Sequence, residues 1–254
     1  WLWKATPSSE RQRELPGGYS TTFEHCNRNT QSVTLDLSKE KGRQVLYRLV
    51  EKCDVFFTNV HRAAKRWGLD YAALSQHNPR LIYVMMTGYG TKGPDWEVGG
   101  YDPLAQARSG MMHTIADPPI IPNSAILDHA TSVMASYGVV AAILARERFG
   151  LGQEVNVSLL STGINLISSE LSRMLMGGGE TVRHERSRYS NPLRNYYHCA
   201  DGKWLMAANT PPDRYWPSFC KALGMEKLEN DPRFENNELR GQNAQELISI
   251  LDAI

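Results

Sequence analysis

The chain has 254 residues, enough to bury a substantial core in one large domain or two smaller ones. Its 28 Lys and Arg residues nearly balance its 27 Asp and Glu residues, so no overall field points to nucleic acid or to a membrane surface as a partner. No apolar run approaches the roughly 20 residues that cross a bilayer and no signal-peptide pattern opens the chain, so we expect a cytoplasmic globular protein.

Strand and helix patterns alternate through the first part of the chain. Short apolar or β-branched runs predict strands, and apolar residues at helical spacing predict helices. In chain order we predict a strand at 32–37, a helix at 39–52, a strand at 54–58, helices at 63–67 and 71–76, and a strand at 81–87. This order indicates an α/β fold in which helices cover a Rossmann-like parallel sheet.

Residues Gly88 to Gly93 match G-x-G-x-x-G directly after the last of these strands. A dinucleotide site requires a helix that begins inside this motif. Pro94, Gly99 and Pro103 follow instead, and no amphipathic helix is expected to begin there. We therefore interpret the motif as a loop.

A long helical pattern runs from Ile126 to the turn at Gly150 and Gly152. Six apolar residues recur at helical spacing and predict a buried face: Val133, Met134, Tyr137, Val140, Ala141 and Leu144. Asp128 lies just ahead of this face, where the helix dipole favours an ionised carboxylate. On position alone an ordinary N-cap also explains this residue, because Asp is a preferred cap.

The second part of the chain has a different pattern. A strand at 154–160 and a helix at 163–176 lead into a polar, arginine-rich stretch at 180–194. We predict a domain boundary there, with a large domain over residues 1–182 and a smaller α+β domain over residues 183–254. In the smaller domain we predict strands at 193–199 and 203–208, followed by helices at 213–223 and 243–253.

The four cysteines include no C-x-x-C pair. They are Cys26, Cys53, Cys199 and Cys220. Free thiols are therefore expected instead of a disulfide frame or a zinc site, and no metal is predicted.

Five ordered blocks between Asn27 and Leu160 resemble the family III CoA-transferases of CaiB/BaiF type, which share a superfamily with α-methylacyl-CoA racemase. The blocks are NRNTQSVTLDL, CDVFFTNV with RWGLDYAAL, NPRLIYVMMTGYGTKGP, YDPLAQARSGMM, and the stretch from Ile126 to Leu160. The resemblance implies a large Rossmann-like domain, a small α+β domain and an interlocked homodimer. It also implies that the chain lacks family segments at both ends.

The resemblance implies a covalent reaction at Asp128, which matches the family's nucleophile position. The carboxylate would attack an acyl-CoA thioester to give a mixed anhydride and CoA thiolate. The thiolate would then form an aspartyl-CoA thioester, from which a carboxylic acid takes CoA by the same steps in reverse. Coenzyme A therefore enters as part of the acyl-CoA substrate, and no metal is needed.

The family's CoA contacts map onto Leu35, Asn59, Val60, Arg66 and Trp67. Tyr89 matches an aromatic residue near the acyl group. A solvated helix face is the alternative for Arg66, and plain loop packing is the alternative for Tyr89.

Two other functions stay open. Racemases of the superfamily carry a His in a G-H-D motif, which acts with the later Asp as a pair of proton carriers. This chain has Gly100-Tyr101-Asp102, and a neutral tyrosine is a poor base at neutral pH. The sequence therefore favours a transferase over a racemase or epimerase. A non-catalytic CoA-binding subunit is the third hypothesis.

Overall fold

The computed structural model describes residues 14–15, 19–116, 118–120, 124–180 and 185–253. The chain divides into two compact units, residues 1–111 with 121–171, and residues 112–120 with 172–254. The predicted boundary between residues 182 and 183 lies outside the described residues.

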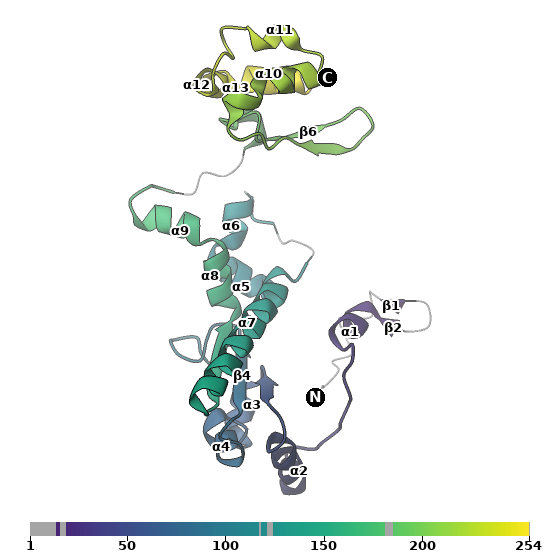
Figure 1. Ribbon diagram of the computed structural model, residues 1–254, viewed down its shortest axis with the longest axis vertical. Helices are drawn as coiled ribbons and strands as arrows, with labels where there is room; N and C mark the ends of the chain where they lie inside the picture. Colours follow the sequence, from purple (N-terminus) through teal and green to yellow (C-terminus); the bar gives the residue numbers. More distant parts are fainter. Residues whose placement is uncertain (1–13, 16–18, 117, 121–123, 181–184, 254) are drawn as a thin grey trace. The chain divides into compact units, whose positions relative to one another are not determined.

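A parallel sheet of three strands lies at the centre of the first unit (Figure 1). Its strands are β3 (Val55–Thr58), β4 (Ile82–Thr87) and β5 (Gln153–Ser158), in the order β3-β4-β5. Val55 pairs with Ile82, which pairs in turn with Gln153. The central strand β4 is buried on both faces, as its continuous apolar sequence predicts.

Helices cover both faces of this sheet because successive side chains of β4 point to opposite sides. Tyr83 and Met85 pack against α2 (Glu40–Val50), α3 (His61–Arg66) and α4 (Tyr71–His77). Ile82 and Val84 pack against α7 (Ile126–Phe149), which lies alongside β4 in Figure 1. The predicted α/β fold with a parallel sheet is confirmed.

The predicted strand at 32–37 is wrong. This segment is irregular, and none of its residues joins a sheet in the part of the chain that the structure describes. Leu35 and Leu37 pack against the core beneath α2 to α4 without a neighbouring strand. The β-branched residues Val33 and Thr34 are exposed, so the alternation reflects one-sided packing of Leu35 and Leu37. The segment ends where Asp36 accepts hydrogen bonds from the Ser38 amide and hydroxyl.

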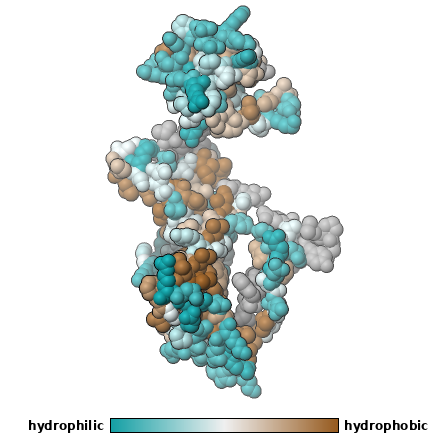
Figure 2. All heavy atoms as spheres, viewed as in Figure 1, coloured by the Kyte–Doolittle hydropathy of each residue, from teal (hydrophilic) through white to brown (hydrophobic). Residues whose placement is uncertain are grey.

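The predicted buried face of α7 is also wrong. Val133, Tyr137 and Val140 are 69%, 72% and 65% exposed, and Figure 2 shows hydrophobic surface over this helix. The face toward the sheet carries Ala135 and Ala142 instead, because small side chains let the helix approach closely. By length and composition alone, α7 is the one helix among the described residues that could cross a membrane; 22% of its most apolar window is buried.

The second unit has its own core. An antiparallel hairpin of β6 (Tyr196–His198) and β7 (Trp204–Met206) precedes the helices of this unit. These helices are α10 (Pro212–Ala222), α11 (Glu226–Glu229), α12 (Asn237–Gln242) and α13 (Ala244–Leu251). The hairpin, α10 and α13 match predicted elements, whereas α11 and α12 were not predicted.

A buried arginine organises that second core. Arg240 is fully buried; it pairs with Asp213, donates to the Phe234 carbonyl at 2.7 Å and lies over the Trp216 ring. Its charge is therefore compensated by a carboxylate, a carbonyl and an aromatic face.

The other elements are short. They are β1 (Glu14–Leu15), β2 (Tyr19–Ser20), α1 (Thr21–Cys26), α5 (Asp102–Ser109), α6 (Met111–Ile115), α8 (Leu159–Leu166), α9 (Ser168–Leu175) and a 3-10 turn at Arg186–Arg188. The single helix predicted at 163–176 is interrupted at Ile167, which separates α8 from α9.

Candidate active site

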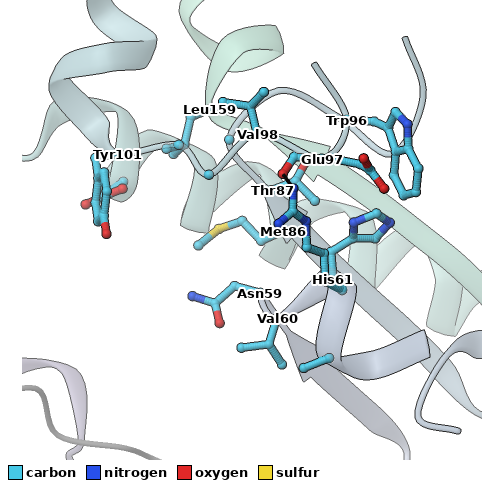
Figure 3. Close-up of a pocket in the computed structure, with 16 residues that line it drawn as sticks. Asn59, Val60, His61, Met86, Thr87, Trp96, Glu97, Val98, Tyr101 and Leu159 are labelled. Atoms are coloured by element: carbon cyan, nitrogen blue, oxygen red, sulfur yellow. Dashed lines mark hydrogen bonds between the residues drawn. The ribbon is translucent and has the colours of Figure 1, made fainter. Parts of the chain in front are cut away.

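A pocket of about 440 Å³ opens where the three parallel strands end (Figure 3). Residues that directly follow each strand line it: Asn59 and Val60 after β3, Gly88 after β4, and Leu159 after β5. The carboxyl ends of parallel strands are the usual position of ligand sites in open α/β sheets. The sheet therefore positions this pocket.

Asp128 reaches the same pocket from α7. The short turn at Gly150–Gly152 joins α7 to β5, so the helix runs back along the strand and its N-terminal turn lies near the strand's carboxyl end. The helix begins at Ile126, which makes Asp128 its third residue. The N-cap interpretation is therefore wrong.

The surroundings of Asp128 disfavour its charge. Burial by the pocket walls raises the pKa of this carboxyl, and the nearby Asp102 carboxylate raises it further. His129 acts in the opposite direction and lowers this pKa. The side chain stays accessible from the pocket, so Asp128 is an ionisable group with increased basicity that a ligand can reach.

Asp102 is the first residue of α5 and is only 6% exposed. Its Oδ2 accepts hydrogen bonds from the backbone amides of Leu127 at 2.6 Å and Asp128 at 2.9 Å. Its Oδ1 accepts a hydrogen bond from the side-chain amide of Gln106. A carboxylate on α5 therefore caps the N-terminus of α7.

The G-x-G-x-x-G motif forms part of a loop beside the pocket, as predicted. No helix begins within it. The two ends of this loop, at Gly88 and Gly100, form its stem and lie in close contact. A Cβ on Gly88 would lie 2.5 Å from the Gly100 Cα. A helix does begin soon after the loop, at Asp102, because Pro103 is compatible with a first helical turn.

Side chains from α3 and α5 hold this loop. Arg62 donates to the Glu97 carbonyl, and the His61 and Trp96 rings meet edge to face at 5.0 Å. Arg108 forms an ion pair with Asp95. Trp96, Glu97 and Val98 consequently form one wall of the pocket, as Figure 3 shows.

Comparison with known proteins identifies the family. The model for CoA-transferase family III matches residues 5–254. The chain belongs to CoA-transferase family III. An acyl-CoA transferase from Fusarium pseudograminearum is 34% identical over 245 residues, which cover 95% of this chain and 53% of the relative. Succinyl-CoA:glutarate CoA-transferase from Mus musculus is 32% identical and covers 92% of this chain and 54% of the relative.

Other relatives of this family III chain include solved structures. Cinnamoyl-CoA:phenyllactate CoA-transferase from Clostridium sporogenes is 29% identical, with 94% of this chain and 60% of the relative covered. A CaiB/BaiF family protein from Brucella suis superposes with a TM-score of 0.81 at 28% identity, covering 94% of this chain and 64% of that one. The chain thus spans between half and two thirds of the length of these relatives.

The structure brings together some of the predicted site residues of this family III chain. Asn59 and Val60 line the pocket with Asp128. Leu35 and Trp67 pack against the core beneath α2 to α4 and do not line the pocket. A role in holding CoA stays a prediction for all of these residues.

Arg66 and Tyr89 also lie outside the pocket lining. Arg66 is exposed at the end of α3. The Arg108 guanidinium lies 4.7 Å from the centre of the Tyr89 ring. The loop-packing alternative therefore describes what Tyr89 contacts here, and its substrate role stays a prediction.

The site includes residues that were not predicted, among them His61, Trp96, Glu97 and Asp102. His61 follows Asn59 and Val60 at the carboxyl end of β3, and that position was a usable signal. Asp102 stands in the Gly100-Tyr101-Asp102 motif, but its capping role gave no local signal, because the amides that it accepts lie 25 and 26 residues further along the chain.

No group of three His, Cys, Asp or Glu side chains among the described residues is placed to hold a metal ion. The four cysteines are free thiols. Burial raises the pKa of the Cys53 thiol and raises that of Cys220 to about 11, so both favour the neutral form at physiological pH.

Proposed function

We propose that Asp128 is the covalent nucleophile of a CoA-transferase that moves CoA from an acyl-CoA thioester to a carboxylic acid. One observation carries the proposal: in a chain of family III, an accessible carboxylate of raised pKa lines a pocket at the carboxyl ends of a parallel sheet. The activity of the whole protein is part of this proposal.

The reaction balances without a redox step or a metal. An Asp128 carboxylate oxygen attacks the thioester carbonyl, the C–S bond breaks, and a mixed anhydride and CoA thiolate form. The thiolate attacks the aspartyl carbonyl of the anhydride and releases the donor acid as a carboxylate. The acceptor carboxylate then attacks the aspartyl carbonyl of the thioester, the C–S bond breaks, and a second mixed anhydride and CoA thiolate form. The thiolate attacks the acceptor acyl carbon, the C–O bond to Asp128 breaks, and the acceptor's CoA thioester and the Asp128 carboxylate are released.

The proposed binding roles are those that the resemblance to the family implies. Asn59 and Val60 lie in the pocket beside Asp128, where the thioester end of acyl-CoA must reach. Arg66, exposed on α3, would pair with a CoA phosphate, and Leu35 and Trp67 would flank the nucleotide end. Tyr89 would contact the acyl group after movement of the loop.

We also propose a homodimer that works in the cytoplasm. The exposed apolar residues of α7 support the dimer, because a second copy would remove that surface from water. The near balance of charges, with no excess of Lys and Arg, is consistent with a small-molecule substrate instead of nucleic acid.

A racemase or epimerase is the second candidate. His61 lines the same pocket as Asp128 and offers a second proton carrier, although Tyr101 occupies the position where racemases carry His. Exchange of the α-proton of an acyl-CoA for deuterium in heavy water, without any acceptor acid, would favour this candidate.

The test of the proposal compares CoA transfer by the unmodified protein and by Asp128→Ala, with donors that include succinyl-CoA and cinnamoyl-CoA. We expect Asp128→Ala to abolish transfer while the far-UV circular dichroism spectrum stays unchanged. Asp36→Ala, in an exposed turn outside the pocket lining, is the control and should retain activity. Near-normal turnover of Asp128→Ala would contradict the proposal. Tight CoA binding without an acyl-enzyme would favour a non-catalytic subunit.

A further inference from the structure

We infer that Asp102 is a positioning residue for Asp128: it caps α7 from a neighbouring helix and holds the nucleophile's backbone at the pocket wall. Its functional meaning rests on the proposed role of Asp128. The placement itself rests on hydrogen bonds between α5 and α7.

The amides at the start of α7 need acceptors from outside the helix. The first four amides of a helix have no partner within the preceding turn of the helix. The Ile126 amide donates to the Ser124 carbonyl at 2.9 Å. The His129 amide makes the first regular bond of the helix, to the carbonyl of the N-cap Ala125 at 3.0 Å. The two amides between them, of Leu127 and Asp128, donate to the same oxygen of Asp102. The N-cap residue of α7, Ala125, makes no side-chain capping hydrogen bond.

The cap fixes the backbone of the proposed nucleophile. One of the two hydrogen bonds is to the backbone amide of the nucleophile itself. Because Asp102 is buried and its other oxygen is held by Gln106, the capping oxygen has little freedom to move. The cap therefore holds the Asp128 backbone in a fixed position from which its side chain meets the pocket.

The charge of Asp102 also acts on the Asp128 carboxylate. Acylation converts the charged Asp128 carboxylate into a neutral anhydride or thioester, which leaves one negative charge where two were close together. The Asp102 carboxylate therefore favours the acylated state and makes the free carboxylate more basic. The other titratable or charged side chains around Asp128 are His129, beside it on α7, and His25 on α1, whose ring lies 6.0 Å from that of His129. The pocket wall adds His61, Arg62, Glu97 and Tyr101.

Asp102→Asn separates the cap from the charge. Its amide oxygen can accept the two α7 amides in place of the carboxylate oxygen. Its NH₂ group would then face Gln106, whose side-chain oxygen is buried without a hydrogen-bond partner among the described residues and can accept after an amide flip. The variant should therefore keep the cap and lose the charge, whereas Asp102→Ala loses both.

The decisive experiment does not depend on activity. The carboxyl carbon of Asp128 is titrated by NMR in the full chain and in Asp102→Asn, with its signal assigned by its loss in Asp128→Asn. We expect a lower Asp128 pKa in Asp102→Asn than in the unmodified chain. We also expect the amides of Leu127 and Asp128 to exchange with solvent at least about tenfold faster in Asp102→Ala. An unchanged Asp128 pKa in Asp102→Asn together with unchanged amide exchange in Asp102→Ala would overturn the inference. If Asp102→Ala does not fold, the Asp128 pKa in Asp102→Asn decides alone.

The rate of acyl-enzyme formation supplies the functional readout. Asp102→Ala should form the Asp128 adduct roughly 100-fold more slowly, because small displacements of reacting groups are costly. In Asp102→Asn the acidic limb of the pH–rate profile should move to lower pH. Asp70→Ala is the matched control: Asp70 caps α4 by accepting the Ala73 amide at 2.9 Å and does not line the pocket. Normal rates and pH profiles in both Asp102 variants would overturn the functional role. If the unmodified chain forms no adduct, the proposed function fails, and the titration still decides the placement.

Discussion

At the residue scale, the pocket holds the Asp128 carboxylate in surroundings that oppose its charge. Burial and the Asp102 charge raise its pKa in the folded chain above the ordinary value of an aspartate. The folded state therefore binds this proton more tightly than the unfolded state does. The free energy of unfolding must then fall as pH rises from the unfolded pKa through the raised folded pKa. At neutral pH the ionised nucleophile destabilises the fold.

Asp128→Asn should consequently raise the melting temperature at pH 7 while it removes activity. The gain should shrink as pH is lowered toward about 4, near the ordinary aspartate pKa, because protonation removes the unfavourable charge from the folded state. Thermal unfolding followed by circular dichroism between pH 7 and pH 4 measures both effects.

Asp36→Asn is the control, because Asp36 lies in the same unit and its pKa is shifted in the opposite direction. Hydrogen bonds from Ser38 lower the Asp36 pKa, so its ionised form stabilises the fold at neutral pH. This control should leave the melting temperature unchanged or lower it at pH 7. A less stable Asp128→Asn protein at pH 7 would contradict the account of the pocket.

Single residues also mark what the sequence alone could predict. Asp128 and Asn59 were found because family motifs carry them, and the structure places both at one pocket. Asp102 was missed because capping usually comes from the residue just before a helix, and here the cap comes from a different helix. A contact of this kind depends on tertiary structure and leaves no local pattern.

At the scale of elements, the loop between Gly88 and Gly100 depends on close contact at its stem. Gly88→Ala should cost about 1–3 kcal/mol in the free energy of unfolding, since its Cβ would meet backbone atoms of Gly100 that cannot yield easily. Denaturation in urea measures this cost. The pocket wall formed by Trp96 and Glu97 should shift as well and slow acylation.

Gly99→Ala is the matched control for this loop. A Cβ on Gly99 would meet no atom within 4 Å, and its backbone does not require glycine. It should behave as the unmodified chain in urea. Equal stability of Gly88→Ala and Gly99→Ala would show that the stem is not tightly packed.

Elements were predictable where local pattern and burial agree. The apolar run of β4 is buried on both faces and was predicted within one residue of its observed start. For α7 the helix itself was predicted, yet its buried face was not. Ala135 and Ala142, with Val139 and Ile143 beside them, pack toward the sheet, and Val133, Tyr137 and Val140 are exposed. Hydrophobic periodicity cannot tell a face that meets the sheet from one that meets a partner.

At the scale of the whole molecule, the exposed face of α7 predicts association. Tyr137→Glu with Val140→Glu should convert the proposed homodimer into a monomer, because burial of two charges without partners opposes assembly. Light scattering after size-exclusion chromatography measures the mass. Lys41→Glu, exposed on α2, is the control and should stay dimeric. An unmodified chain that is monomeric at all concentrations, or a double variant that stays dimeric, would contradict this assignment.

The most direct test of the central claim is intact-protein mass spectrometry of the chain after incubation with a panel of acyl-CoAs and quenching with hydroxylamine or borohydride. We predict a modification that maps to Asp128 and is absent from Asp128→Asn. An unmodified mass with every donor, or a modification that maps to another residue, would contradict Asp128 as the covalent nucleophile.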